Sequence, residues 1–204
     1  MPRLGGSEGN ARLTSMTAIA LLVLLALEGV TILFIGPLLS AHVFVGLVLV
    51  PPVALKLAST GWRFVSYYSG RPEYVAKGPP RFVLRVLVAP VVVVSTIVLF
   101  GTGIAMLTVH PRAGPLLGLH KASFIVWLAA TGIHVLAYLP RLWSLVRGDL
   151  AAASRFPSAK LRFGLVTAAV AVGVLFAAGS FHLVASSTFS SCPGSTGCRV
   201  TIRR

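Results

Sequence analysis

The chain has 204 residues, of which 56% are hydrophobic and only 11% are charged. Soluble domains carry about 25% charged residues, so this chain has too few polar side chains to cover a water-soluble surface. Its net charge of +14 could suggest a nucleic-acid binder, whose basic residues form a footprint on a soluble face. Here the basic residues flank apolar runs instead. Membrane topology and anionic lipids explain that pattern better, so the chain is expected to meet a lipid bilayer and no nucleic acid.

Five apolar runs are long enough to cross a bilayer as helices, which takes roughly 20 apolar residues each. Helices are expected rather than strands, because the runs do not alternate and lipid requires every backbone polar group to be bonded within the protein. The first run could also be the core of a signal peptide, but its length and Glu28 favour a retained helix. The sequence thus predicts an all-α integral membrane protein with five transmembrane helices: residues 16–35, 40–57, 82–108, 116–139 and 163–184.

The segments between the spans are short or interfacial. The stretch IGPLLSA is expected to be a tight loop that makes the first two spans an antiparallel hairpin, and the prolines at 51, 52 and 90 predict local kinks. Residues 58–81 form the largest connection, and its aromatic residues beside basic ones are typical of a membrane interface. These aromatic residues are Trp62, Phe64, Tyr67 and Tyr68.

The distribution of lysine and arginine predicts the orientation, because cytoplasmic loops carry an excess of both. If the N-terminus is cytoplasmic, 13 of the 18 lie on the inner side and five on the outer side. We therefore expect a multi-pass protein of the cell (plasma or inner) membrane, with a cytoplasmic N-terminus (1–15), a membrane domain (16–185) and an external basic tail (186–204). The 13 inner residues are Arg3, Arg12, Lys56, Arg63, Arg71, Lys77, Arg81, Arg85, Arg141, Arg147, Arg155, Lys160 and Arg162.

Four candidate ligands repeat at one interval on the second and fourth spans. His42 and Lys56 are 14 positions apart, and so are His120 and His134. Fourteen residues make nearly four helical turns, about 21 Å of rise and about 40° of rotation, so each pair shares one helix face near opposite membrane surfaces. Because the two spans run in the same direction, His42 is expected level with His120, and Lys56 level with His134.

Imidazoles from facing helices of a bundle can ligate the iron of a b-type haem, and a neutral lysine amine can also bind iron. Gly46, one turn beyond His42, and Gly132, beside His134, would leave room for a macrocycle. The haem propionates need cationic partners. The candidates are Arg81 and Arg85 for the inner haem and Lys121 and Arg112 for the outer one, although each could simply flank a span.

This pattern resembles the membrane cytochrome b families, which include cytochrome b/b6-like proteins and di-haem membrane-anchor subunits of respiratory oxidoreductases. The resemblance covers the first four spans and rests on SAHVFVGLVLVPPVALKLAST and LHKASFIVWLAATGIHVLAYL. It implies a haem-binding helical bundle with two haem b groups, an outer one on His42 and His120 and an inner one on Lys56 and His134. In those families all four positions are histidine, so Lys56 is a departure. The resemblance also implies an electron-transfer subunit of an oxidoreductase that links a quinone pool to a redox protein or enzyme subunit.

Other interpretations of the same residues remain open. The chain could be a transmembrane reductase of a small external acceptor, or a haem-free subunit that transports metal ions or protons. A lone histidine on an apolar face is often a hydrogen-bonded core residue, and Lys56 could snorkel to the headgroups. Glu28, the only acid within a span, could have a proton-linked or a structural role. His182 could approach the outer haem or a quinone, whereas His110 is expected to be solvated.

The predicted orientation can be tested on the two cysteines of the tail. An external, oxidising compartment favours a disulfide between Cys192 and Cys198. A membrane-impermeant thiol reagent should therefore label intact cells only after reduction. Labelling of both cysteines without prior reduction would contradict the disulfide, and protection of both after reduction would contradict the orientation.

Overall fold

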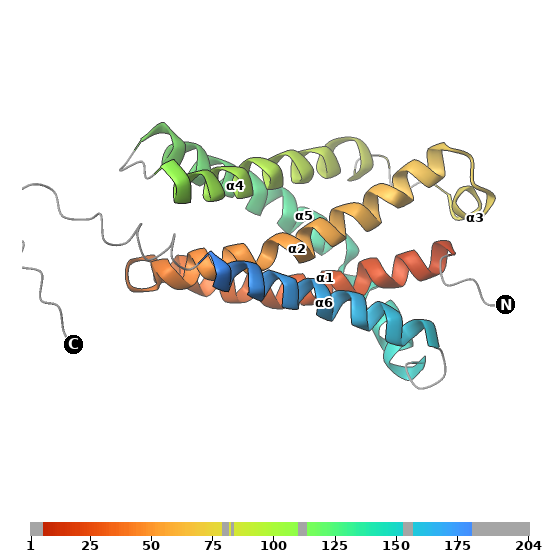
Figure 1. The fold of residues 1–204 in the computed structure, drawn as a ribbon. Coiled ribbons are helices and arrows are strands. Elements are labelled where there is room, and N and C mark those ends of the chain that lie inside the picture. Colours follow the sequence, from red (N-terminus) through yellow and green to blue (C-terminus); the bar gives the residue numbers. More distant parts are fainter. Residues whose placement is uncertain (1–5, 79–81, 83, 110–113, 153–156, 181–204) are drawn as a thin grey trace, which may run out of the picture.

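The computed structural model describes residues 6–78, 82, 84–109, 114–152 and 157–180; the side chains of 84, 85, 109, 140–152 and 157–159 are not described. This part of the chain is helical throughout (Figure 1). In chain order the elements are α1 (Ser7–Leu33), α2 (Ile35–Tyr68), α3 (Pro72–Val75), the π-helix η1 (Leu84–Val88), α4 (Ala89–Val109), α5 (Pro115–Ala152) and α6 (Pro157–Gly179).

Five of these helices are long and apolar enough to cross a membrane, which confirms the predicted number of transmembrane helices. Large hydrophobic side chains cover much of the outside of the bundle; Leu33, Leu136 and Leu175 are each more than 70% exposed. Such a surface suits acyl chains rather than water. The protein is therefore a multi-pass membrane protein.

The helix ends differ from the expected ones. The first connection is shorter than expected: most of the stretch IGPLLSA is helical, and non-helical φ and ψ occur at Phe34, just before α2 begins at Ile35, and at Leu38, where α2 has a kink. At the other end α2 continues through the aromatic residues to Tyr68 and stops where Gly70 adopts a φ of +70°. Glycine takes this left-handed conformation without a Cβ clash, so it terminates helices. The aromatic segment is thus the last part of α2, with Trp62 and Tyr68 at least half exposed.

The prolines lie in helical backbone. Helical φ and ψ persist through Pro51 and Pro52, and the π-helix Leu84–Val88 ends two residues before Pro90. A proline has no N–H, so Pro52 leaves the carbonyl of Val48, four residues earlier, without its intrahelical bond. Gly173 of α6 lies directly against that carbonyl, and a β-carbon at this position would overlap it. The carbonyl that Pro52 leaves unbonded thus lies on the surface of α2 that faces Gly173 of α6.

Four helices form a closed ring. α1 packs on α2, α2 on α4, α4 on α5, and α5 on α1, so that α2 and α5 face each other across the ring (Figure 1). α6 lies outside the ring against α2 and α1. A small buried core of Leu47, Val48, Leu107 and Ala177 joins α2, α4 and α6. The two helices that carry the candidate ligands are therefore the diagonal pair of a four-helix ring.

The contact between α2 and α6 makes a testable prediction. Gly173→Ala should lower the stability by about 1–3 kcal/mol, because the new methyl group must displace the Val48 carbonyl or the whole of α6. The matched control is Gly164→Ala on the same helix, where a β-carbon meets nothing within 4 Å. Thermal unfolding in detergent is the measurement. Equal unfolding midpoints for the two variants would contradict the close approach.

Candidate functional site

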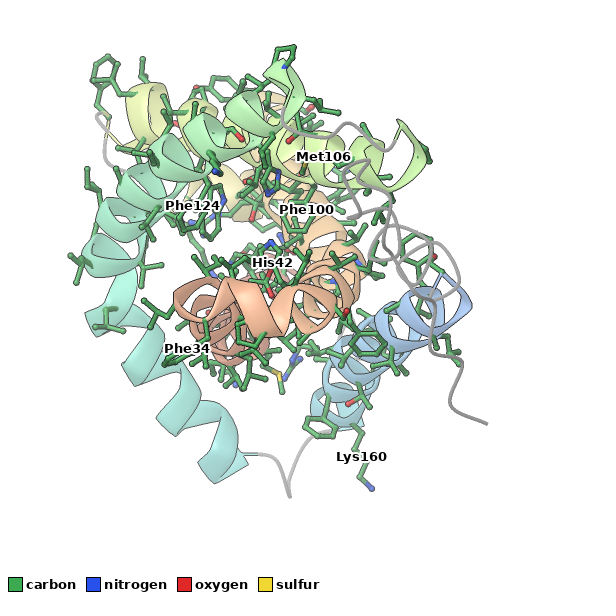
Figure 2. All side chains as sticks on the ribbon, turned by 90° about the vertical axis from the view of Figure 1, so that its left-hand side faces the viewer. Phe34, His42, Phe100, Met106, Phe124 and Lys160 are labelled. Atoms are coloured by element: carbon green, nitrogen blue, oxygen red, sulfur yellow. The ribbon has the colours of Figure 1, made fainter. Side chains whose placement is uncertain are left out.

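Two imidazoles meet across the ring of helices. His42, in the second turn of α2, lies in the middle of the molecule in Figure 2, and His120 comes from the second turn of α5. Their ring centroids are 6.5 Å apart and their planes lie at 82° to each other. α2 and α5 are not among the helix pairs whose backbones pack closely. The two helices therefore approach each other here through their histidine side chains.

The Nδ1 atom of His42 is bonded to α1. It lies 2.8 Å from Oε1 of Glu28 and 3.2 Å from the hydroxyl of Thr31. The Thr31 hydroxyl in turn donates to the Glu28 main-chain carbonyl at 2.7 Å and lies 3.2 Å from Oε2. A carboxylate can only accept, so Nδ1 of His42 donates to it. In the neutral ring this leaves Nε2 with a free lone pair.

Gly46 lies beside the carboxylate of Glu28, one turn after His42. A β-carbon at this position would lie 3.5 Å from Oε1 of Glu28, an ordinary contact distance. The carboxylate of α1 therefore lies next to the backbone of α2. The expected role of Gly46 in making room for a macrocycle stays a prediction.

The Nδ1 atom of His120 is bonded to α4 in a parallel manner. It lies 3.1 Å from the carbonyl oxygen of Leu99 and 3.0 Å from the hydroxyl oxygen of Thr102. Because a carbonyl can only accept, Nδ1 of His120 carries the proton and Nε2 keeps its lone pair. Gly103 allows the ring this close to α4, since a β-carbon there would lie 3.3 Å from Cε1 of His120.

These two histidines have the form of metal ligands. A metal-bound histidine usually donates its other ring N–H to a carboxylate or a main-chain carbonyl, and His42 and His120 show one case each. Within the described residues, no three His, Cys, Asp or Glu side chains converge on a point. The donor set is thus two imidazoles, which suits a metal whose other ligands come from a macrocycle, as in haem.

The separation of the rings fits the same group. An imidazole nitrogen lies about 2 Å from a bound transition metal, and roughly 1 Å separates that nitrogen from the centre of its ring. Two imidazoles on opposite sides of one metal ion would therefore have centroids about 6 Å apart. The observed 6.5 Å agrees with this spacing.

Lys56 and His134 lie at the other end of the same helices. The Lys56 amine donates to the main-chain carbonyl of Thr14 on α1 at 2.8 Å. His134 lies within electrostatic reach of Lys56 and has its ring 4.9 Å from that of Tyr138. Its Nδ1 is buried and finds no hydrogen-bond partner among the described residues. The structure thus directs the Lys56 amine towards α1.

The remaining candidates are less informative. Gly132 has open space where a β-carbon would lie, and Lys121 is exposed at the start of α5. The side chains of Arg81 and Arg85 lie outside the part of the chain that the structure describes. Five further residues named above also lie outside it, namely His110, Arg112, His182, Cys192 and Cys198.

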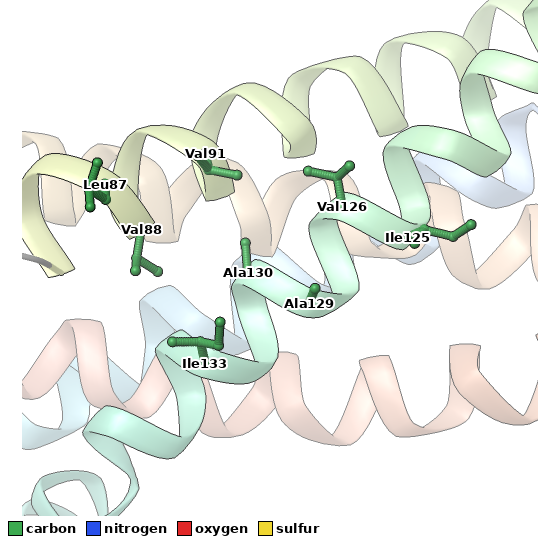
Figure 3. Close-up of a pocket in the computed structure, with 8 residues that line it drawn as sticks. All are labelled: Leu87, Val88, Val91, Ile125, Val126, Ala129, Ala130 and Ile133. Atoms are coloured by element: carbon green, nitrogen blue, oxygen red, sulfur yellow. The ribbon is translucent and has the colours of Figure 1, made fainter.

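An apolar groove of about 470 Å³ lies between α5 and the segment formed by η1 and α4 (Figure 3). Its lining consists only of leucine, valine, isoleucine and alanine side chains, such as Val91, Val126 and Ala130. No titratable or hydrogen-bonding side chain lines it. The groove is therefore suited to an acyl chain. The histidine pair is the candidate functional site, because its side chains can bind a ligand or a proton.

Three partners of the site were not predicted: Thr31, Thr102 and the carbonyl of Leu99. The spacing of Thr31 three residues after Glu28 was the one available signal for a shared helix face. Comparisons with known protein families, with curated proteins and with solved structures found no match. The function must therefore be argued from the residues of this chain.

Proposed function

We propose that this chain is a membrane cytochrome b that carries electrons across the bilayer, with a b-type haem held by His42 and His120. One observation carries the proposal. Both rings have Nδ1 bonded to an acceptor, so that two Nε2 donor atoms remain on imidazoles 6.5 Å apart inside the bundle. This is the donor set that a six-coordinate haem iron needs from a protein.

Each part of the site has a separate task in this proposal. His42 and His120 would hold the iron from the two diagonal helices, while Glu28 and the Leu99 carbonyl fix their tautomers. The apolar side chains of the bundle exclude water and lower the local polarity. When bound, the haem supplies a one-electron couple whose potential depends on its axial ligands and on burial.

The second haem of the proposal lies at the level of Lys56 and His134. It is supported by the equal spacing on both helices and by the buried, unpaired Nδ1 of His134. To bind iron, Lys56 must leave the Thr14 carbonyl and lose its proton. Two haems near opposite membrane surfaces would provide a route across the bilayer. The pairing of their propionates with Arg81, Arg85 and Lys121 is part of the same proposal.

The proposed partners follow from the resemblance to the membrane cytochrome b families. A quinone would exchange electrons on one side of the membrane, and a redox protein or another oxidoreductase subunit on the other. The distribution of basic residues supports a cytoplasmic N-terminus. The cell membrane is the location that this orientation implies.

A second candidate function is haem-free proton transport. It is favoured by the polar row that crosses the ring from Glu28 on α1 through His42 and His120 to Thr102 on α4. Intramembrane ionisable residues of this kind also form proton relays. A transmembrane reductase of ferric iron or oxygen would need the same haems as the cytochrome. A pyridine haemochrome assay on purified protein therefore separates the transporter from both.

Haem stoichiometry tests the outer site directly. Purified protein should contain b-type haem. Both His42→Ala and His120→Ala should lose the outer haem, because its iron would be left with one protein ligand in a dry site. His134→Ala is the matched control: it removes an imidazole from the same helix and should lose the inner haem, while the absorption spectrum of the outer haem stays unchanged. Full occupancy and an unchanged absorption spectrum in the first two variants would refute the assignment.

The inner site has its own test. Lys56→Met should change the spectrum and potential of the inner haem, because a thioether replaces an amine. Lys56→His should instead give an ordinary bis-histidine haem and preserve the haem-to-protein ratio. Absorption spectra and redox titration are the measurements. A wild-type protein with a single haem that both Lys56 variants leave unchanged would restrict the function to the outer site.

A further inference from the structure

We infer that Glu28 is the positioning residue of His42 and that it makes the two axial histidines unequal electron donors. This inference rests on the proposed function, because it concerns how the outer haem would be tuned. His42 is bonded to a buried carboxylate, whereas His120 is bonded to a main-chain carbonyl. Glu28 would not bind the iron itself. It would act only through its hydrogen bond to the ring of His42.

The placement of Glu28 is specific to this role. The residue is only 8% exposed, Oε1 accepts from His42 at 2.8 Å and Oε2 lies 3.2 Å from the Thr31 hydroxyl. The carboxylate lies beside Gly46 of α2, where a β-carbon would be 3.5 Å from Oε1. The other described glutamates have different partners: Glu8 pairs with Arg12, and Glu73 accepts from the backbone of Ser7. Among the described side chains, Glu28 is the acid that serves the bundle interior.

A carboxylate in a membrane span is costly, and neither lysine nor arginine offsets this cost at Glu28 among its described contacts. Its hydrogen bond to Nδ1 draws the proton away from the imidazole and makes Nε2 more basic. A more basic ligand stabilises oxidised iron relative to reduced iron, which lowers the midpoint potential. The neutral carbonyl of Leu99 has a weaker effect on His120. The ligand on α2 is therefore the stronger donor.

The same hydrogen bond fixes the plane of the His42 ring. The two imidazole planes are nearly perpendicular, at 82°. Perpendicular rings interact almost equally with the two iron d orbitals of π symmetry, so these orbitals stay close in energy and the low-spin ferric spectrum is strongly anisotropic. Loss of the Glu28 contact would free the His42 ring to turn. The electron paramagnetic resonance spectrum therefore reports the positioning role separately from haem content.

The experiment compares Glu28→Gln, Glu28→Asp and Glu28→Ala in the full-length, haem-loaded protein. Glu28→Gln keeps the shape but removes the charge, so the midpoint potential of the outer haem should rise. Glu28→Asp keeps the charge at shorter reach, so its potential should stay nearer that of the wild type. Glu28→Ala should weaken haem binding by about 10–100-fold and reduce the spectral anisotropy. Glu8→Gln, a matched change at the far end of α1, should alter none of these.

The outcomes separate this inference from the proposed function. If Glu28→Gln and Glu28→Asp both bind haem with the potential and resonance spectrum of the wild type, the positioning role is refuted while the cytochrome assignment stands. If the wild type binds no haem, both are refuted. A higher potential in Glu28→Gln than in Glu28→Asp, together with a changed resonance spectrum, supports the inference even if Glu28→Ala fails to fold.

Discussion

The hydrocarbon of a bilayer offers no hydrogen-bond partner, and this constraint determines where each polar group of the protein lies. Hydroxyls within the spans bond to carbonyls of the preceding turn, as Thr17 does to Leu13 and Thr96 to Val92. The side chains of Glu28, His42, Lys56 and His120 are turned inward and bonded across helices. Glu28 and Lys56 join α1 to α2 in this way, at opposite ends of the hairpin. Because the helices are apolar on all sides, the polar contacts determine which face of each helix points into the bundle.

The five spans could be predicted because hydropathy and length are properties of each segment alone. Helix ends could not, since they depend on single residues whose conformation the pattern does not reveal. Non-helical Phe34 and the kink at Leu38 replace a seven-residue loop, and the end of α2 is set by Gly70 with its φ of +70°. The two prolines of α2 keep helical φ and ψ. The Val48 carbonyl, which Pro52 cannot bond, faces Gly173 of the neighbouring helix.

In the candidate site, the spacing of the residues determines their depth, whereas the packing of the helices determines their hydrogen-bond partners. Helical periodicity alone puts His42 and His120 at one depth. Their hydrogen-bond partners come from α1 and α4, and this depends on which helices flank the diagonal of the ring. For Lys56 the periodicity predicts the level but not the rotamer, and the amine lies on the Thr14 carbonyl. The direction of a side chain therefore could not be predicted from the residue spacing.

The helices form two groups, and packing is closer within each group than between them. α1, α2 and α6 are locked together by the Gly173 contact and by the polar bonds of the hairpin, while α4 and α5 pair mainly with each other. Each group contributes one of the two central imidazoles. A group bound between His42 and His120 would thus act as a cross-link between two preassembled halves, and its binding free energy would also be a free energy of tertiary assembly.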